Sequence, residues 1–376
     1  MTVYQENDTL CLINAPKRRF LMEYVMRSIF WDENLQCVKV IDQSCLPTEL
    51  RYLELHTSVD VAEAIQKMVV RGAPAIGVCA AFGMALASRE SNQSDIDKLK
   101  TYLHDTGQYL LATRPTAINL TWAVENMLSL VDQFSGSVSE LQEALLSKAQ
   151  QMADEDVNTN LAIARNGADL LMDGDVIITH CNTGALATVD YGTALGVIRL
   201  AHEQGKHIHV YVDETRPCLQ GSRLTTWELT QYGIPYDIIV DAAAGYMIRS
   251  GKVDRVLFGA DRVAANGDVI NKIGTYMLAL AAYDNGIPAY AAFPISSIDF
   301  SSPNGDAVPI EERDPAEVLA LTYQGRAVFP EGATARNYAF DITPHRLLSG
   351  LITESGVLYP PFFRSLTVLK HAGRNS

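Results

Sequence analysis

Five apolar, strand-like runs dominate the second half of the chain, and helical stretches separate them. The runs cover residues 175–180, 207–213, 237–241, 254–260 and 288–293. The helical stretches end close to four glycines, Gly205, Gly233, Gly251 and Gly286. Glycine just past a helix is a common stop signal, and unbroken apolar strands that alternate with helices are typical of a parallel sheet covered on both faces. We therefore predict an α/β fold with a Rossmann-like parallel-sheet domain over residues 173–376.

The first part of the chain has a different pattern of predicted strands and helices. Short strand-like pieces occur within residues 20–40 and 51–55, and helical spacing follows in the segments 60–70, 75–88, 94–112 and 117–132. A chain of 376 residues is long enough for two cores. We predict a smaller N-terminal α+β domain, a small sheet plus helices, over residues 1–137, and a bridging helix over 138–172.

Composition excludes several classes of function. The net charge of −14 argues against a nucleic-acid partner, because a phosphate backbone requires a basic face. No apolar run approaches the ~20 residues that span a bilayer, and the N-terminus has no signal-peptide pattern. The six cysteines are scattered without a C-x-x-C pair, which favours reduced thiols in a cytoplasmic protein and argues against a metal site.

In a parallel α/β sheet, ligands bind outside the carboxyl ends of the strands. Cys181 follows the strand-like run 175–180, and the residues 182–184 (Asn-Thr-Gly) let the chain turn beside it. A thiol close to a helix N-terminus tends to have a lowered pKa and higher reactivity. The alternative is that Cys181 is a small buried side chain. The adjacent His180 is expected to be a packed or supporting residue, because neighbouring strand residues point to opposite faces.

Asp261 ends another of these strand-like runs. Burial and neighbouring acids at other strand ends would both disfavour its ionisation, so this carboxyl could stay protonated and donate a proton. The alternative is an ordinary helix cap or an ion pair with Arg262.

Three cations precede or begin predicted helices: Arg71, Arg114 and Lys272. A cation is disfavoured at a helix N-terminus unless an anion is bound there. Together they favour a phosphate site, although each could be a solvated side chain. Neither a G-x-G-x-x-G nor a G-x-S-x-G motif supports a dinucleotide or a serine-hydrolase site. The irregular segment 299–316 is a candidate lid.

Several motifs, in order along almost the whole chain, resemble the methylthioribose-1-phosphate isomerase family. They are RGAPAIG (71–77), RPTAINL (114–120), HCNTGALAT (180–188), DETRPCLQGSRLT (213–225), GADRVAANGDVINKIGTYMLA (259–279) and PIEER (309–313). The resemblance implies an aldose–ketose isomerase of methionine salvage that acts on a sugar 1-phosphate, forms a homodimer and needs no metal or cofactor. It implies that Cys181 and Asp261 are the catalytic pair. The substrate-binding residues it implies are Arg71, Gly72, Ala73, Arg114, Gln220, Asn271 and Lys272.

The chain departs from the family pattern at two places. Val189-Asp190-Tyr191 stands where Ala-Gly-Tyr is usual, and Tyr338 stands where proline is usual. These changes leave the 5-substituent of the sugar open, because relatives act on 5-deoxyribose 1-phosphate or ribose 1,5-bisphosphate. A further alternative is a non-catalytic protein, since regulatory subunits of a translation-initiation exchange factor share the fold.

Overall fold

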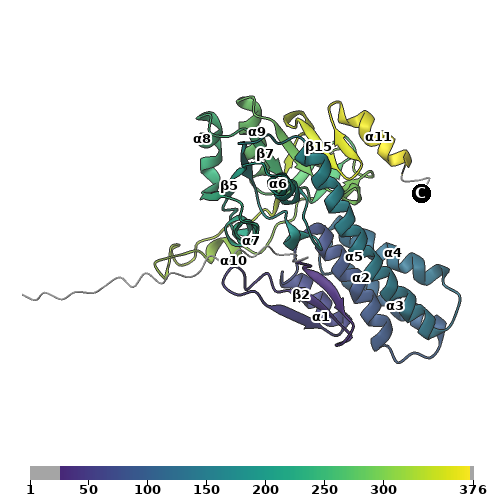
Figure 1. Ribbon diagram of the computed structural model, residues 1–376. Helices are drawn as coiled ribbons and strands as arrows, with labels where there is room; N and C mark the ends of the chain where they lie inside the picture. Colours follow the sequence, from purple (N-terminus) through teal and green to yellow (C-terminus); the bar gives the residue numbers. More distant parts are fainter. Residues whose placement is uncertain (1–25, 373–376) are drawn as a thin grey trace, which may run out of the picture.

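The computed structural model describes residues 26–372. The molecule has two parts of different architecture (Figure 1). The strand-like piece expected at 20–26 lies almost entirely outside the described residues. The N-terminal part holds an antiparallel sheet of three strands, β1 (Ile29–Asp32), β2 (Cys37–Ile41) and β3 (Tyr52–Leu55). Five helices follow: α1 (Ser58–Gln66), α2 (Ala73–Glu90), α3 (Ile96–Leu111), α4 (Ile118–Gln133) and α5 (Val138–Ala168). This arrangement confirms the predicted small sheet plus helices.

Helix α2 forms the centre of the N-terminal part. Its sequence is apolar on all sides, and 15 of its residues are buried against neighbours that include α4 and α5. The helices α2 and α4 approach closely at Gly77, where an added Cβ would lie 2.8 Å from the carbonyl oxygen of Asn119. This packing places the N-terminal ends of α2 and α4 at one edge of the N-terminal part.

The C-terminal part is built on a seven-stranded sheet in the order β16-β15-β10-β7-β4-β5-β6. All neighbouring strands are parallel except β15 and β16, which are antiparallel. The strands are β4 (Val176–Thr179), β5 (His209–Asp213), β6 (Tyr236–Ile239), β7 (Arg255–Phe258), β10 (Ala289–Ala292), β15 (Gly350–Thr353) and β16 (Gly356–Leu358). The helices of this part are α6 (Ala194–Glu203), α7 (Thr226–Tyr232), α8 (Ala244–Arg249), α9 (Thr275–Asp284) and α11 (Phe362–Ala372). The predicted Rossmann-like domain is confirmed.

The sequence did not reveal a second, four-stranded sheet in this part. Its order is β11-β8-β9-β14, with β8 (Arg262–Ala264), β9 (Val269–Lys272), β11 (Ile298–Asp299) and β14 (Phe340–Thr343). The chain leaves β7, folds back through a turn at Gly267 (φ +94°) and forms the β8–β9 hairpin before α9 begins. Lys272 therefore lies at the end of a strand, three residues before α9, and not at the start of the helix as expected.

The bridging helix α5 ends at Ala168, earlier than the expected residue 172. The domain boundaries at residues 137 and 172 stay predictions. After β11, the chain runs through residues 300–339 with only short elements, among them α10 (Ala316–Leu319), β12 (Thr322–Tyr323) and β13 (Arg326–Ala327). The irregular segment is thus longer than the predicted 299–316.

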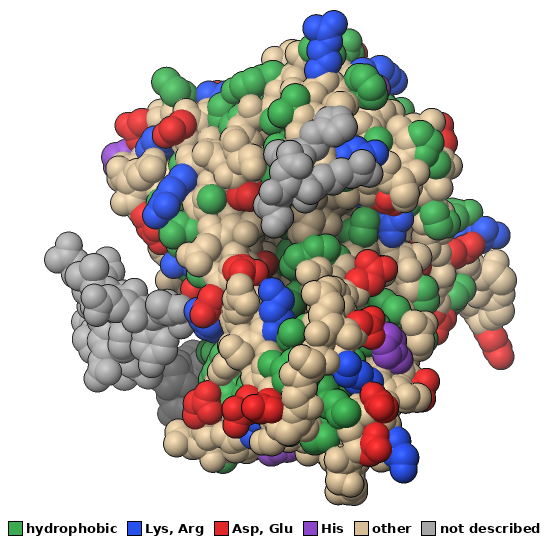
Figure 2. All heavy atoms as spheres, turned by 90° about the vertical axis from the view of Figure 1, so that its right-hand side faces the viewer, with side chains coloured by type: hydrophobic (Ala, Val, Ile, Leu, Met, Phe, Trp, Pro, Cys, Tyr) green, Lys and Arg blue, Asp and Glu red, His purple; other side chains and the backbone are tan. Residues whose placement is uncertain are grey.

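No helix within residues 26–372 is long and apolar enough to cross a membrane. On the face shown in Figure 2, acidic and basic side chains are intermixed, and no continuous basic surface forms among the described residues there.

Candidate active site

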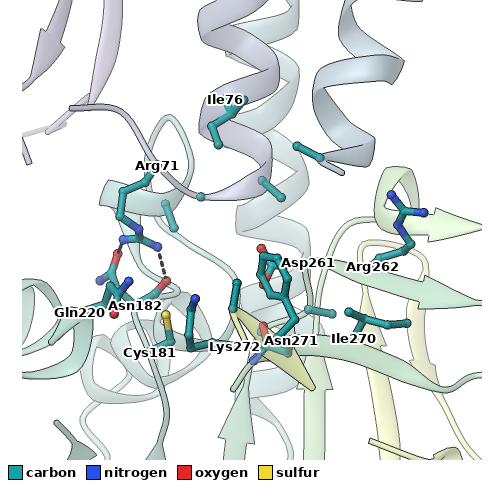
Figure 3. A pocket seen from close by; sticks show the side chains of 18 of the residues that line it. Arg71, Ile76, Cys181, Asn182, Gln220, Asp261, Arg262, Ile270, Asn271 and Lys272 are labelled. Atoms are coloured by element: carbon teal, nitrogen blue, oxygen red, sulfur yellow. Dashed lines mark hydrogen bonds between the residues drawn. The ribbon is translucent and has the colours of Figure 1, made fainter. Parts of the chain in front are cut away.

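A cavity lies where the two parts of the molecule meet, between the N-terminal ends of α2 and α4 and the carboxyl ends of β4, β7 and β9 (Figure 3). All nine residues that the sequence analysis singled out for the site line this cavity. They are Arg71, Gly72, Ala73, Arg114, Cys181, Gln220, Asp261, Asn271 and Lys272. The fold therefore brings together residues that are up to 201 positions apart in the sequence.

Cys181 makes the sharp turn after β4 itself. Its φ is +63°, in the left-handed region that non-glycine residues seldom adopt. Two threonines hold it there: its N–H donates to Oγ1 of Thr215 (2.9 Å), and its carbonyl accepts from Oγ1 of Thr225 (2.6 Å). The expectation that residues 182–184 make the turn was therefore wrong in detail, and the backbone strain is located at the thiol-bearing residue.

The Cys181 side chain is buried, with 8% of its surface exposed. Burial raises the pKa of the thiol above its ordinary value, although the charges of Arg71 and Lys272 act in the opposite direction. The expected lowered pKa was wrong. Only a short 3-10 turn at Ala185–Ala187 follows Cys181, and α6 begins as late as Ala194, so the helix expected directly after the thiol is not there.

Asp261 lies three residues after β7 and directly before β8, and its backbone N–H donates to the carbonyl of Ile270 (3.0 Å). Burial raises the pKa of the carboxyl, and the charges of Lys272 and Arg114 oppose this change. The raised pKa of Asp261 agrees with the sequence argument, but one of the two causes that the argument gave was wrong. The nearby acid that contributes is Glu311, from the irregular segment, and not an acid at another strand end.

Several cations line the cavity, and Lys272 among them has no partner in the described structure. Among residues 26–372, no hydrogen bond or ion pair engages the ammonium group of Lys272, which lies 4.9 Å from the ring of Phe340. Nε of Arg114 and Oε1 of Gln220 are buried without a hydrogen-bond partner in the described structure. Arg114 meets Glu311 only at 3.6 Å. Groups of this kind are normally paired, so they indicate a polar ligand.

Both helices that reach the cavity lack a side-chain cap. The N-cap of α2 is Gly72 and that of α4 is Ala117, and neither side chain can accept a hydrogen bond from the first turn. Gly72 has φ +95°, and an added Cβ would lie 2.4 Å from the carbonyl oxygen of Ala187. Uncapped helix N-termini attract anions through their free N–H groups. With the cations Arg71, Arg114 and Lys272, they make this cavity suitable for a phosphate.

Sequence reasoning missed the residues that orient Arg71. Its guanidinium donates to Oδ1 (2.6 Å) and to the carbonyl oxygen (2.9 Å) of Asn182 (Figure 3). The side-chain amide of Asn182 donates in turn to the fully buried carboxyl of Glu228 (2.7 Å), which also accepts from the N–H of Ala185 (2.7 Å). Asn182 lies in a motif that the sequence analysis quoted, but nothing in the sequence connects Glu228 to it.

The two departures from the family pattern lie away from the cavity walls. Asp190 is buried behind the turn that follows Cys181 and pairs with Arg199 (3.3 Å). Tyr338 is 45% exposed, and its ring is approached by Arg336 at 5.4 Å. Neither side chain lines the cavity.

Comparison with known proteins is consistent with this geometry. The model of the initiation factor 2 subunit family, IF-2B, matches residues 69–360. The chain belongs to this family. Within it, "Methylthioribose-1-phosphate isomerase" from Synechococcus sp. is 50% identical over 340 residues, which cover 90% of this chain and 97% of that protein. The protein of the same name from Acetivibrio thermocellus is 48% identical and covers 86% of this chain and 95% of its own length. The resemblance stated from the motifs is confirmed.

Solved structures of the family share the fold. The structure of 5-methylthioribose 1-phosphate isomerase from Pyrococcus horikoshii is 42% identical, with a TM-score of 0.84, and the match covers 92% of this chain and 96% of that one. A structure described as translation initiation factor eIF-2B, subunit delta, from A. fulgidus is 45% identical, with a TM-score of 0.79 and coverage of 90% and 97%.

Proposed function

We propose that this protein is an aldose–ketose isomerase that converts 5-methylthioribose 1-phosphate to 5-methylthioribulose 1-phosphate. One observation carries the proposal: a buried thiol, Cys181, and a carboxyl of raised pKa, Asp261, line one cavity together with the ammonium group of Lys272. The identity of 48–50% to proteins named methylthioribose-1-phosphate isomerase supports the same activity.

The phosphate is assigned to Lys272, Arg114 and Arg71, with the uncapped ends of α2 and α4. An anionic substrate approaches a protein of net charge −14, so its binding depends on this local positive charge. Charge-assisted hydrogen bonds to a phosphate are stronger than neutral ones and fix its orientation. The phosphate then places C1 and C2 of the sugar between the thiol and the carboxyl.

Asp261 is assigned the role of general acid. A phosphate on O1 prevents the simple ring opening that provides other aldoses with a free aldehyde. A carboxyl kept protonated by burial can donate to the ring oxygen and open the furanose. Hydrogen then moves from C2 to C1, either as a proton relayed by Cys181 or as a hydride that shifts directly while Cys181 stabilises the developing charge.

A direct assay tests the proposal. Purified protein should convert 5-methylthioribose 1-phosphate to the ketose, measured by NMR, without added metal or nucleotide. Assays of 5-deoxyribose 1-phosphate and ribose 1,5-bisphosphate alongside it would identify the preferred 5-substituent. Faster turnover of one of these sugars would keep the reaction class and change the substrate, whereas no turnover of any of the three would contradict the proposal.

A second candidate is a regulatory, non-catalytic protein of translation initiation. It is favoured by the 45% identity to the structure described as an eIF-2B delta subunit. A non-catalytic role requires neither a thiol–carboxyl pair nor an unpaired cation in a cavity, so we favour the isomerase. The homodimer implied by the resemblance stays a prediction, which sedimentation would test.

A further inference from the structure

His180 lies beneath the cavity, and no step of the proposed reaction uses it. It directly precedes Cys181 and is 1% exposed. Its Nδ1 lies 2.9 Å from Oδ2 of Asp213, at the end of β5, and its Nε2 lies 2.9 Å from the carbonyl oxygen of Ile273. Both ring nitrogens are thus occupied, so this imidazole is not available as a base for the thiol.

The bond to Ile273 fixes one proton on the ring. A carbonyl oxygen can only accept, so Nε2 must carry a hydrogen. Burial alone would lower the pKa of His180, but the hydrogen bond and charge of Asp213 raise it above its ordinary value. Whether the second proton resides on Nδ1 or on the carboxyl, the Nε2–H donates to Ile273. The link is therefore present in either state of the pair.

This link connects two parts of the site that no backbone ladder joins. Cys181 follows β4 of the seven-stranded sheet, whereas Lys272 ends β9 of the four-stranded sheet. Ile273 directly follows Lys272. The next residue, Gly274, has φ +105°, and an added Cβ there would lie 2.9 Å from Cε1 of His180. The imidazole thus packs directly against the connection that carries Lys272.

We infer that His180 is a positioning residue that sets the spacing between Cys181 and Lys272 through its hydrogen bond to the carbonyl of Ile273. The inference deepens the proposed function and rests on it for the role of these two residues.

A metal site is a poorer interpretation of the same cluster, although ligand atoms of His180, Asp213 and Asp241 lie within 4.8 Å of one another. The carboxylate oxygens of Asp241 accept the N–H groups of Thr215 and Arg216, each at 2.8 Å.

Two conservative variants separate the two ring contacts. The amide nitrogen of glutamine reaches the position of Nε2, and that of asparagine reaches the position of Nδ1. His180→Gln should therefore keep the bond to Ile273, and His180→Asn should lose it. For H180N we expect about tenfold weaker binding of inorganic phosphate, because the loss of one hydrogen bond weakens binding by about this factor. KM should rise by a similar factor, and kcat should fall. H180Q should stay within about threefold of wild type in each quantity.

The controls distinguish positioning from general stability. His209→Asn makes the same substitution on β5, where His209 pairs with Asp237 away from the cavity, and it should leave the kinetics unchanged. Equal losses in H180N and H180Q, or normal phosphate binding in H180N, would overturn the inference.

A third variant covers the case in which neither His180 substitution folds. In Asp213→Asn the amide can donate to Nδ1, so the bond from Nε2 to Ile273 is retained and phosphate affinity should stay within about threefold. A tenfold loss in folded D213N would also refute the inference. Phosphate binding by calorimetry tests His180 even if wild type turned over none of the sugar phosphates, an outcome that would contradict only the proposed function.

Discussion

Cys181 combines a strained backbone with a buried thiol. A non-glycine residue in the left-handed region costs about 1–3 kcal/mol, and such strain persists only where the surroundings enforce it. Here Thr215 and Thr225 bind the N–H and the carbonyl of Cys181. This conformation turns the thiol into the cavity that Asp261 also lines (Figure 3).

The residue-scale prediction concerns this pair. Cys181→Ala and Asp261→Asn should each lower kcat by at least ~100-fold, the low end for acid–base catalysis, while circular dichroism and the melting temperature stay near wild type. Cys218→Ala provides a matched control, because Cys218 is a second thiol on the cavity wall, and it should lose far less activity. Near-normal turnover in either of the first two variants would remove that residue from the mechanism.

At the scale of elements, the long helix α5 binds the segment that follows the thiol-bearing turn. Oδ2 of Asp156, on α5, accepts the N–H of Val189 at 2.7 Å. Burial, together with the charge of Asp190, raises the pKa of this carboxyl to about 7, although the hydrogen bond from Val189 opposes the change. Between pH ~4 and ~7 the folded state therefore binds more protons than the unfolded state, and the free energy of unfolding decreases as pH rises.

Asp156→Asn should remove this pH dependence. The neutral amide keeps an acceptor for Val189 and has no charge to bury, so the variant should gain stability over wild type as pH rises from 5 to 8. We expect a difference on the order of 1–2 kcal/mol at pH 8, measured by denaturant unfolding. Glu155→Gln, at the exposed neighbouring position, is the control. A stability difference that does not change with pH would show that Asp156 is ionised in the folded protein.

At the scale of the whole molecule, the cavity exists only because two parts of the chain meet. Arg262 bridges them at the cavity wall: its guanidinium donates to the carbonyl of Thr116 (2.6 Å) and to Asp299 (3.1 Å). Thr116 in turn donates to Glu311 (2.9 Å), which belongs to the irregular segment. These contacts join the N-terminal helices, the four-stranded sheet and the irregular segment at the cavity wall.

A closed site should protect the hydrogen that moves from C2 to C1. With deuterium at C2 of 5-methylthioribose 1-phosphate, we expect the ketose to retain most of the label at C1, measured by mass spectrometry. A direct hydride shift predicts near-complete retention, and relay by a shielded thiol predicts partial loss. Arg262→Met should increase the loss to solvent. Complete washout in the wild type would contradict a closed pocket.

The sequence by itself determined the parallel sheet, the small N-terminal sheet with its helices, and the position of Cys181 just after a strand of the parallel sheet. These features depend on local periodicity and on chain order, which the sequence contains directly. The β8–β9 hairpin was missed because Arg, Asn and Lys interrupt its short strands, which lack the unbroken apolar runs that marked the strands of the parallel sheet. Lys272 was consequently placed on the wrong element.

Only the tertiary structure decided the electrostatics of the site. The pKa of Cys181 is raised, not lowered, because burial outweighs two nearby cations, and a sequence does not show how deeply a thiol is buried. The contacts of Glu228 with Asn182 and of His180 with Ile273 join positions 46 and 93 residues apart. Such contacts depend on how elements distant in the chain pack together, and local sequence carries no signal for that packing.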